Sequence, residues 1–272
     1  MKGKILITGS SGLIGSSLYN AFASEHHVTG VDITNKGVGT TDIQSDISNL
    51  DELSRILNEE KPEIVIHAAA IKDLAACEAN PSRATRVNLE TTKVLAQYTA
   101  EHPETKLVYL SSNIIIDGRE GNYTEQSRPN PINVYGETKH QSEKRVLLSP
   151  RNVVCRTALV LREAPEVGST YATLNRELGQ KVLSNQSLFI EYVIGSLKRG
   201  KQIYMSEKHI ANPTPVKLLT SQIREVIRKG LSGVLHTAGP ISISRYDFAR
   251  TIAKEYGLPR EGIVKSQAGM LT

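Results

Sequence analysis

A glycine-rich turn directly after the first apolar run restricts the fold of this chain more than any other stretch. Residues 5–7 suit a strand that is buried on both faces, and Gly9-Ser10-Ser11-Gly12-Leu13-Ile14-Gly15 follows shortly after it. Gly9 and Gly12 let the backbone turn sharply and approach a ligand, while Gly15 lets the next helix lie close to the strand. That helix begins near Gly12 and directs its free N–H groups and the positive end of its dipole at the turn. The stretch therefore predicts a pyrophosphate site.

A second apolar run ends in an acid at a spacing that fits a dinucleotide. Residues 28–31 read as a strand, and Asp32 follows them, 17 residues after Gly15. A carboxylate at about this spacing holds the ribose hydroxyls of an adenosine. The turn and the acid together favour a dinucleotide ligand.

Other candidates follow later apolar runs, because ligands of a parallel sheet bind beyond the carboxyl ends of its strands. Ala68-Ala69-Ala70 comes after the run 64–67, and such small residues let a flat ring or a ribose approach the backbone. Ordinary packing explains the triplet equally well. Asp46 could touch the adenine edge, and loop capping is an equal interpretation. We interpret His67 as a histidine in a structural hydrogen bond and not as a catalyst.

Composition narrows the class of protein. The chain has 272 residues, of which 39% are hydrophobic and 22% charged, enough for a large α/β core or two closely joined domains. No apolar run approaches the ~20 residues that span a bilayer, and Met1 leads directly into the first strand, so we expect no membrane partner and a cytoplasmic location. The net charge of +5 suits phosphate-bearing ligands, but the basic residues are scattered, so we expect no nucleic-acid partner. Cys77 and Cys155 lack metal-ligand spacing, and we expect free thiols and no metal site.

Strands and helices alternate along residues 1–158. This alternation implies right-handed crossovers and one parallel sheet. We predict an α/β Rossmann fold, a doubly wound parallel sheet, for this dinucleotide-binding part. The predicted elements include strands 64–67 and 107–110, a helix 50–59 with a capping box of Ser48 and Asp51, and a long helix from Asn80-Pro81 to about Ala100.

We predict that residues 159–272 form a smaller, mostly helical substrate lobe, interleaved with late strands of the sheet. Arg156, Lys198 and Arg199 could meet a diphosphate, although we interpret each as solvated surface. The predicted elements are helices 169–179, 188–198 and 216–228, strands 202–205 and 234–237, and a helix that Ser244 and Asp247 cap and that ends at Tyr256.

Candidate chemistry lies at Tyr135 and Lys139, which are four residues apart on a predicted helix and so share one face. A free tyrosine has a pKa of about 10, and a neighbouring ammonium lowers that pKa by favouring the phenolate. Tyr135 is therefore a candidate general acid. Ser112, at the end of the fourth strand, could hydrogen-bond the same substrate oxygen. Such a pair occurs by chance in many helices, and its place downstream of a dinucleotide turn makes it a catalytic candidate.

The order of these motifs resembles an extended short-chain dehydrogenase/reductase of the NAD-dependent epimerase/dehydratase superfamily, and more narrowly its dTDP-4-dehydrorhamnose reductase branch. The resemblance covers nearly the whole chain and is strongest to about residue 160. The matching stretches are residues 8–15, His67 to Ala70, Val87-Asn88, Leu110 to Gly118, Tyr123-Thr124-Glu125, Pro129-Asn130-Pro131, Tyr135 to Lys139, Arg156-Thr157, Pro213-Thr214 and Ser244 to Ala249.

The resemblance implies hydride transfer between NADP or NAD and a nucleotide-linked 4-keto-6-deoxy sugar. Tyr135 would protonate the carbonyl oxygen, Lys139 would lower the tyrosine pKa and bind the nicotinamide ribose, and Ser112 would polarise the carbonyl. Asp32 favours NAD by repelling a 2′-phosphate, while nearby Lys36 leaves NADP open. The cofactor-binding residues are then Gly9, Ser11, Gly12, Leu13, Ile14, Gly15, Asp32, Asp46, Ile47, Ala68, Ala69, Ala70, Tyr135 and Lys139.

Departures from the branch concentrate where the substrate should bind. Asn113 and Ile114 stand where the family usually has Asp-Tyr, and Leu159 stands in place of a tryptophan. The sequence therefore leaves the identity of the sugar open. It also leaves open whether the chain forms a homodimer.

Two alternatives remain. One is a sugar-nucleotide epimerase or dehydratase that keeps a tightly held NAD. The other is an NADP-binding regulatory protein resembling the regulatory subunit of methionine adenosyltransferase.

Overall fold

A computed structural model describes residues 3–35, 39–162 and 189–266, which fall into two compact units. The first unit comprises residues 1–157 and 220–237, and the second comprises 158–219 and 238–272. The chain therefore leaves the first unit and returns to it. The predicted helix 169–179 and Lys36 lie outside the described residues.

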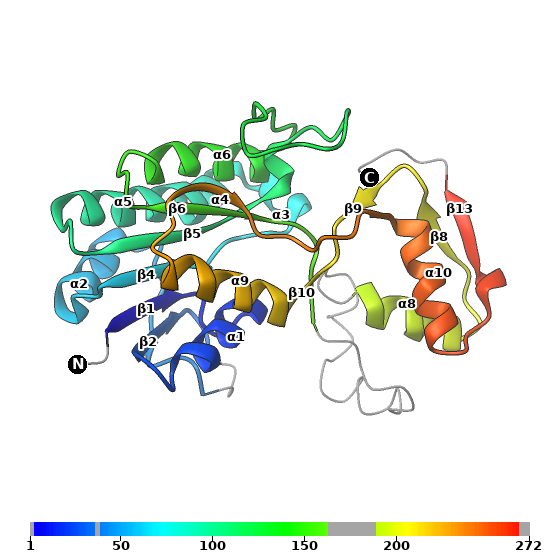
Figure 1. The fold of residues 1–272 in the computed structure, drawn as a ribbon, viewed down its shortest axis with the longest axis horizontal. Coiled ribbons are helices and arrows are strands. Elements are labelled where there is room, and N and C mark those ends of the chain that lie inside the picture. The colour runs from blue at the N-terminus through cyan, green and yellow to red at the C-terminus, as the bar shows by residue number, and fades with distance from the viewer. Residues whose placement is uncertain (1–2, 36–38, 163–188, 267–272) are drawn as a thin grey trace. The chain divides into compact units, whose positions relative to one another are not determined.

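A parallel sheet of seven strands forms the centre of the first unit, and its spatial order is β11-β6-β5-β4-β1-β2-β3 (Figure 1). Because β1 lies inside the sheet with β2 on one side and β4 on the other, the sheet is doubly wound, and the predicted fold is confirmed. The strands are β1 Lys4–Thr8, β2 His27–Asp32, β3 Ile43–Gln44, β4 Ile64–His67, β5 Lys106–Ser112, β6 Val153–Thr157 and β11 Gly233–His236.

Helices cover both faces of this sheet: Figure 1 shows α5 and α6 over one face and α1 and α9 over the other. Buried apolar side chains such as Leu6, Leu53, Leu95, Tyr109 and Val154 form a continuous core under the first of these faces. The helices are α1 Leu13–Phe22, α2 Leu50–Glu60, α3 Leu74–Ala79, α4 Pro81–Thr85, the π-helical turn η1 Arg86–Glu90, α5 Thr91–Glu101, the 3₁₀ turn η2 Asn113–Ile115, α6 Val134–Val146 and α9 Val216–Arg228.

One local prediction was wrong, and a second is confirmed with an added feature. The side chain that caps α2 belongs to Asn49, which accepts from the Glu52 amide, and not to Ser48. The long helix after Pro81 contains the π-helical turn η1, at which Asn88 faces inward. There its carboxamide accepts from the Ile71 N–H (2.8 Å) and donates to the Ile71 C=O (3.0 Å), so the turn fixes the chain that leaves β4.

The second unit packs two helices against short strands around its own apolar core, to which Phe189, Ile194, Ile203, Ala249 and Ile263 contribute. Ser244 caps α10 by accepting from the Asp247 amide, as predicted. The elements are β7 Val160–Leu161, α8 Phe189–Lys198, β8 Ile203–Ser206, β9 Ile210–Ala211, β10 Thr214–Pro215, β12 Ile243–Ser244, α10 Arg245–Glu255, the 3₁₀ turn η5 Arg260–Gly262 and β13 Ile263–Ser266.

Candidate functional site

The turn between β1 and α1 accepts only glycine at two of its positions. Gly9 has a φ of +72°, and a Cβ there would lie 2.7 Å from the Ala69 nitrogen. A Cβ on Gly15 would lie 2.1 Å from the Gly9 oxygen, so α1 packs directly on the turn. Gly12 begins α1 without a side-chain cap, which leaves the first N–H groups, including those of Leu13 and Ile14, available to an anion. These residues fit a bound pyrophosphate.

Asp32 ends β2 beside this turn. Its carboxylate accepts from the Ser11 N–H (3.0 Å) and from the Thr34 N–H (3.1 Å). The structure thus brings Ser11 and Asp32 together and holds the acid at the carboxyl end of the sheet. An acid in this position suits the vicinal hydroxyls of an adenosine ribose.

The remaining candidates for cofactor binding follow β3 and β4, and they differ in what they contact. Asp46 is exposed and accepts from the Ser48 N–H (2.9 Å). This contact fits the interpretation of Asp46 as a loop-capping residue. Ile47 is buried in the core under α2 and α5. Ala68, Ala69 and Ala70 are partly exposed after β4, and Ala69 faces Gly9.

His67 is a buried structural residue, as predicted. One ring nitrogen lies 2.6 Å from the Thr8 hydroxyl, and the other lies 3.5 Å from the Thr91 hydroxyl. Burial lowers the pKa of His67 to about 3, and the nearby Lys139 acts in the same direction. The ring is therefore neutral near pH 7 and has both nitrogens engaged.

The three catalytic candidates come from β5 and α6. Ser112 is the last residue of β5, and Asn133 caps α6 by accepting from the Gly136 N–H (2.7 Å). This cap places Tyr135 in the first turn of α6, partly exposed, and Lys139 one turn later, buried. The Ser112 side chain acts on the Tyr135 phenol, and the Ser112 hydroxyl itself accepts from the Ile114 N–H (3.2 Å). The arrangement puts a phenol and a hydroxyl together beside the end of a central strand.

Burial shifts the pKa of two groups in this cluster. It raises the pKa of Tyr135 to about 12, and the Ser112 side chain opposes that rise. Burial lowers the pKa of Lys139 to about 7, while Glu143 acts the other way. Lys139 is not among the groups that shift the pKa of Tyr135 here, and its predicted effect on the tyrosine stays a prediction. The Lys139 amine lies 4.3 Å from the centre of the Tyr109 ring.

Sequence reasoning missed a buried ion pair between Glu143 on α6 and Arg156 on β6. Their closest atoms, Oε2 and Nη2, lie 2.8 Å apart, and the exposed fractions of the two side chains are 3% and 6%. Arg156 is thus neither solvated surface nor free to meet a diphosphate. Local spacing gave no signal for this pair, because the two residues lie on different elements.

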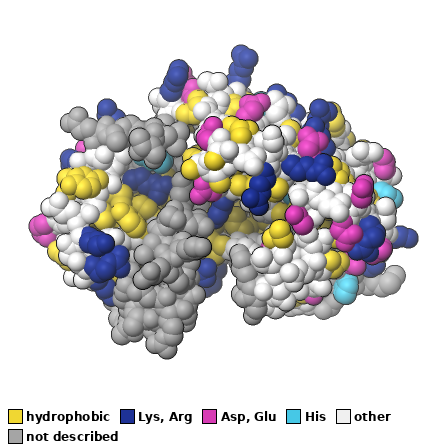
Figure 2. Space-filling model, turned by 180° about the vertical axis from the view of Figure 1, so that it is seen from behind, with side chains coloured by type: hydrophobic (Ala, Val, Ile, Leu, Met, Phe, Trp, Pro, Cys, Tyr) yellow, Lys and Arg dark blue, Asp and Glu magenta, His cyan; other side chains and the backbone are white. Residues whose placement is uncertain are grey.

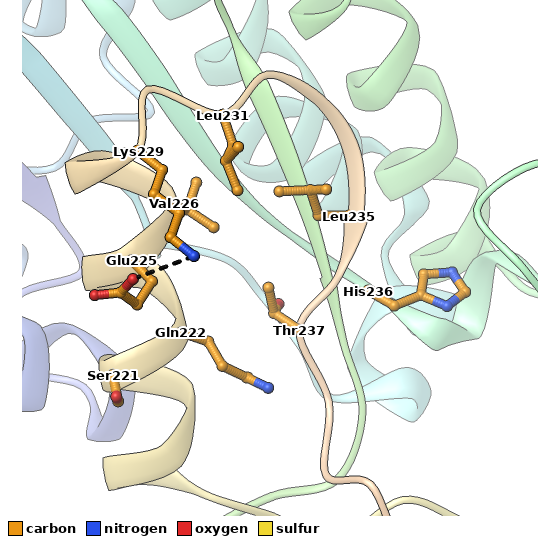
Figure 3. A pocket seen from close by; sticks show the side chains of 9 residues that line it. All are labelled: Ser221, Gln222, Glu225, Val226, Lys229, Leu231, Leu235, His236 and Thr237. Atoms are coloured by element: carbon orange, nitrogen blue, oxygen red, sulfur yellow. Dashed lines mark ion pairs between the residues drawn. The ribbon is translucent and has the colours of Figure 1, made fainter.

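A separate pocket of about 310 Å³ opens between α9 and β11 (Figure 3). Val226, Leu231 and Leu235 give it an apolar wall, and its acid, Glu225, is paired with Lys229 at 3.6 Å. The lining includes no predicted site residue.

The described residues include no helix long and apolar enough to cross a membrane. They also hold no group of three or more His, Cys, Asp or Glu side chains arranged for a metal ion. On the face in Figure 2, Lys and Arg side chains are interspersed with Asp and Glu and form no basic stripe among the described residues.

Proteins of known identity are similar to this chain in sequence and in fold. The rat methionine adenosyltransferase 2 subunit beta is 26% identical over 263 residues, which cover 94% of this chain and 73% of that protein. A dTDP-4-dehydrorhamnose reductase from Aggregatibacter actinomycetemcomitans is 26% identical over 262 residues, covering 93% and 79%.

Among solved structures, the dTDP-4-dehydrorhamnose reductase of Bacillus anthracis in complex with NADP superposes with a TM-score of 0.81. It is 24% identical, and the match covers 98% of this chain and 85% of that one. Residues 3–268 match the RmlD substrate binding domain, and the chain belongs to that family.

Proposed function

We propose that this chain is an NAD(P)-dependent reductase of a nucleotide-linked 4-keto-6-deoxy sugar. The observation that carries the proposal is the placement of Ser112 at the end of β5, with Tyr135 and Lys139 one turn apart on α6. Membership of the RmlD family and the likeness to dTDP-4-dehydrorhamnose reductases support the same reaction.

The cofactor site that we propose follows from the turn and its acid. Gly9, Gly12 and Gly15 let the backbone close on a pyrophosphate, and the N–H groups that begin α1 bind it. Asp32 would accept from the ribose hydroxyls, and Ala68 to Ala70 leave room beside the turn. Leu13 and Ile14 belong to the proposed site. Asp46 and Ile47 are also proposed to contact the cofactor, although Asp46 accepts from the Ser48 N–H and Ile47 lies in the core.

The proposed chemistry divides between cofactor and side chains. Bound NADH or NADPH supplies the hydride. Ser112 donates a hydrogen bond to the substrate carbonyl oxygen, and Tyr135 gives its phenolic proton to that oxygen. Burial keeps Tyr135 protonated near pH 7, which suits a donor. Lys139 would bind the nicotinamide ribose.

The test is oxidation of NADH and of NADPH, measured separately, with dTDP-4-dehydro-6-deoxy-mannose as the substrate. Tyr135→Phe should lower the rate about 100-fold or more, because it removes the general acid. Tyr98→Phe is the matched control, since the Tyr98 hydroxyl donates to the Leu57 C=O between α5 and α2. Absence of turnover by the wild type, with cofactor binding intact, would reject this substrate.

A regulatory, NADP-binding protein is the second candidate, because the methionine adenosyltransferase subunit beta matches the chain over a similar length. Co-purification of a methionine adenosyltransferase, with no binding of any sugar nucleotide, would favour it. Retention of all three of Ser112, Tyr135 and Lys139 favours the enzyme. An epimerase or dehydratase remains open and would retain NAD through purification. A cytoplasmic location and a homodimer remain predictions, which fractionation and light scattering would test.

A further inference from the structure

Glu143 sits in a buried network that the proposed reaction does not use. Its Oε1 accepts from the Ser111 hydroxyl (2.5 Å) and from Arg156 Nε (3.1 Å), while its Oε2 accepts from Arg156 Nη2 (2.8 Å). The carboxylate therefore has three donors from β5 and β6. Such bidentate pairing fixes the orientation of both side chains.

The network reaches the catalytic candidates along two elements. Ser111 directly precedes Ser112 on β5, and Glu143 lies one helical turn after Lys139 on α6. Arg156 also donates to the Glu125 C=O (3.4 Å), and the Glu125 carboxylate accepts from the His236 N–H (3.0 Å). The ion pair thus ties α6 to β5, to β6 and to the loop that precedes α6.

The charge of Glu143 matters because burial disfavours the ammonium form of Lys139. His67 is neutral, and the Tyr109 ring attracts the ammonium but carries no negative charge. Within this set, the negative charge comes from Glu143. The groups around Lys139 and Tyr135 are His67 of β4, Tyr109 of β5, Arg156 of β6, Cys77 of α3, and Tyr135 and Glu143 of α6.

We infer that Glu143 is a positioning residue, which keeps the Lys139 amine protonated at neutral pH while Arg156 and Ser111 hold its carboxylate in place. The role of Lys139 in turnover rests on the proposed function, but its protonation does not. The pKa of Lys139, about 7, places the amine where loss of one nearby negative charge changes its state.

NMR titration of the full chain, with lysine labelled at Cε with ¹³C, tests the inference without turnover. Lys139→Met assigns the resonance by removing it. Glu143→Gln keeps the shape of the side chain and should lower the titration midpoint of Lys139 by about one pH unit or more. Glu137→Gln is the matched control, because Glu137 lies exposed on the same helix, and it should leave the midpoint unchanged.

Glu143→Gln leaves Arg156 buried without its partner, which destabilises the fold, so a second variant is needed. The double variant Glu143→Gln with Arg156→Met removes both charges and should lower the midpoint by less than Glu143→Gln alone, because loss of the Arg156 charge partly offsets loss of the carboxylate. An unchanged midpoint in both folded variants would overturn the inference.

The rate measurement then separates the inference from the proposed function. If the wild type turns over, the pH at which Glu143→Gln loses activity on the alkaline side should fall together with the NMR midpoint. A midpoint that moves without the rate profile would overturn the positioning role. A wild type without turnover would reject the proposed function, while the titration would still decide whether Glu143 controls Lys139.

Discussion

The tight packing of α1 on the glycine turn predicts the effect of Gly15→Ala. The added Cβ would lie 2.1 Å from the Gly9 oxygen and 2.9 Å from the Ser10 Cα, where real Cβ atoms essentially never approach within 3.0 Å. Both obstacles are backbone atoms, so α1 and the turn must separate by about 1 Å. Overpacking of this kind costs about 1–3 kcal/mol.

For a chain of this size, that cost corresponds to a Tm lower by about 2–12 °C. The displaced turn should also weaken NADH and NADPH binding, because it moves the N–H groups at the start of α1 that we propose to bind the pyrophosphate. Differential scanning calorimetry and cofactor fluorescence titration measure the two effects.

Gly3→Ala is the control, because its Cβ would meet the flexible end of Glu63 at 3.1 Å, and its stability should change by less than about 0.5 kcal/mol. A Gly15→Ala protein with the Tm and the cofactor affinity of the wild type would refute the reasoning.

Three further predictions concern buried or charged groups. Asn152→Ala should lower the free energy of unfolding by about 3 kcal/mol in urea denaturation. The Asn152 carboxamide accepts from the Leu107 N–H (2.9 Å) and donates to the Val146 C=O (3.1 Å), and both groups would lose this partner. A loss below about 1 kcal/mol would contradict the prediction. Burial lowers the pKa of His67 from 6.5 to about 3, so the stability that its neutral ring confers is complete above pH 6.5 and declines as the pH falls toward 3. The free energy of unfolding should decline by up to about 1.4 kcal/mol per pH unit. Between pH 7 and pH 5, the urea midpoint of His67→Gln should fall less than that of the wild type. An equal fall in both proteins would exclude His67 as the source. Asp32→Asn should raise the NADPH to NADH rate ratio about tenfold, because it removes the charge that repels a 2′-phosphate, and an unchanged ratio would assign cofactor choice to other residues.

The sequence predicted the sheet well because each strand carries its own signal. Runs such as residues 5–7 and 64–66 are apolar throughout and fit strands that are buried on both faces. The predicted cap at Ser244 is local as well, since it bonds an amide three residues away. The cap of α2 was misplaced by one residue because Ser48 and Asn49 are adjacent and both are good capping residues.

The candidate site was only partly predictable, because its electrostatics depend on contacts between distant segments. Tyr135 and Lys139 share a helix, so their proximity follows from spacing. The pairing of Glu143 with Arg156 joins α6 to β6 through the tertiary fold. Burial, which raises the pKa of Tyr135 and lowers that of Lys139, likewise arises from packing that a linear pattern does not contain.

The return of the chain to the first unit has a consequence for synthesis on the ribosome. All residues of β6 are buried, and its outer neighbour in the sheet, β11, lies 76 residues further along the chain from Thr157 to Gly233. Until residue 236 leaves the exit tunnel, β6 is an open edge with unpaired backbone groups, which invites association with other nascent chains. Expression of residues 1–157 alone should therefore yield aggregates.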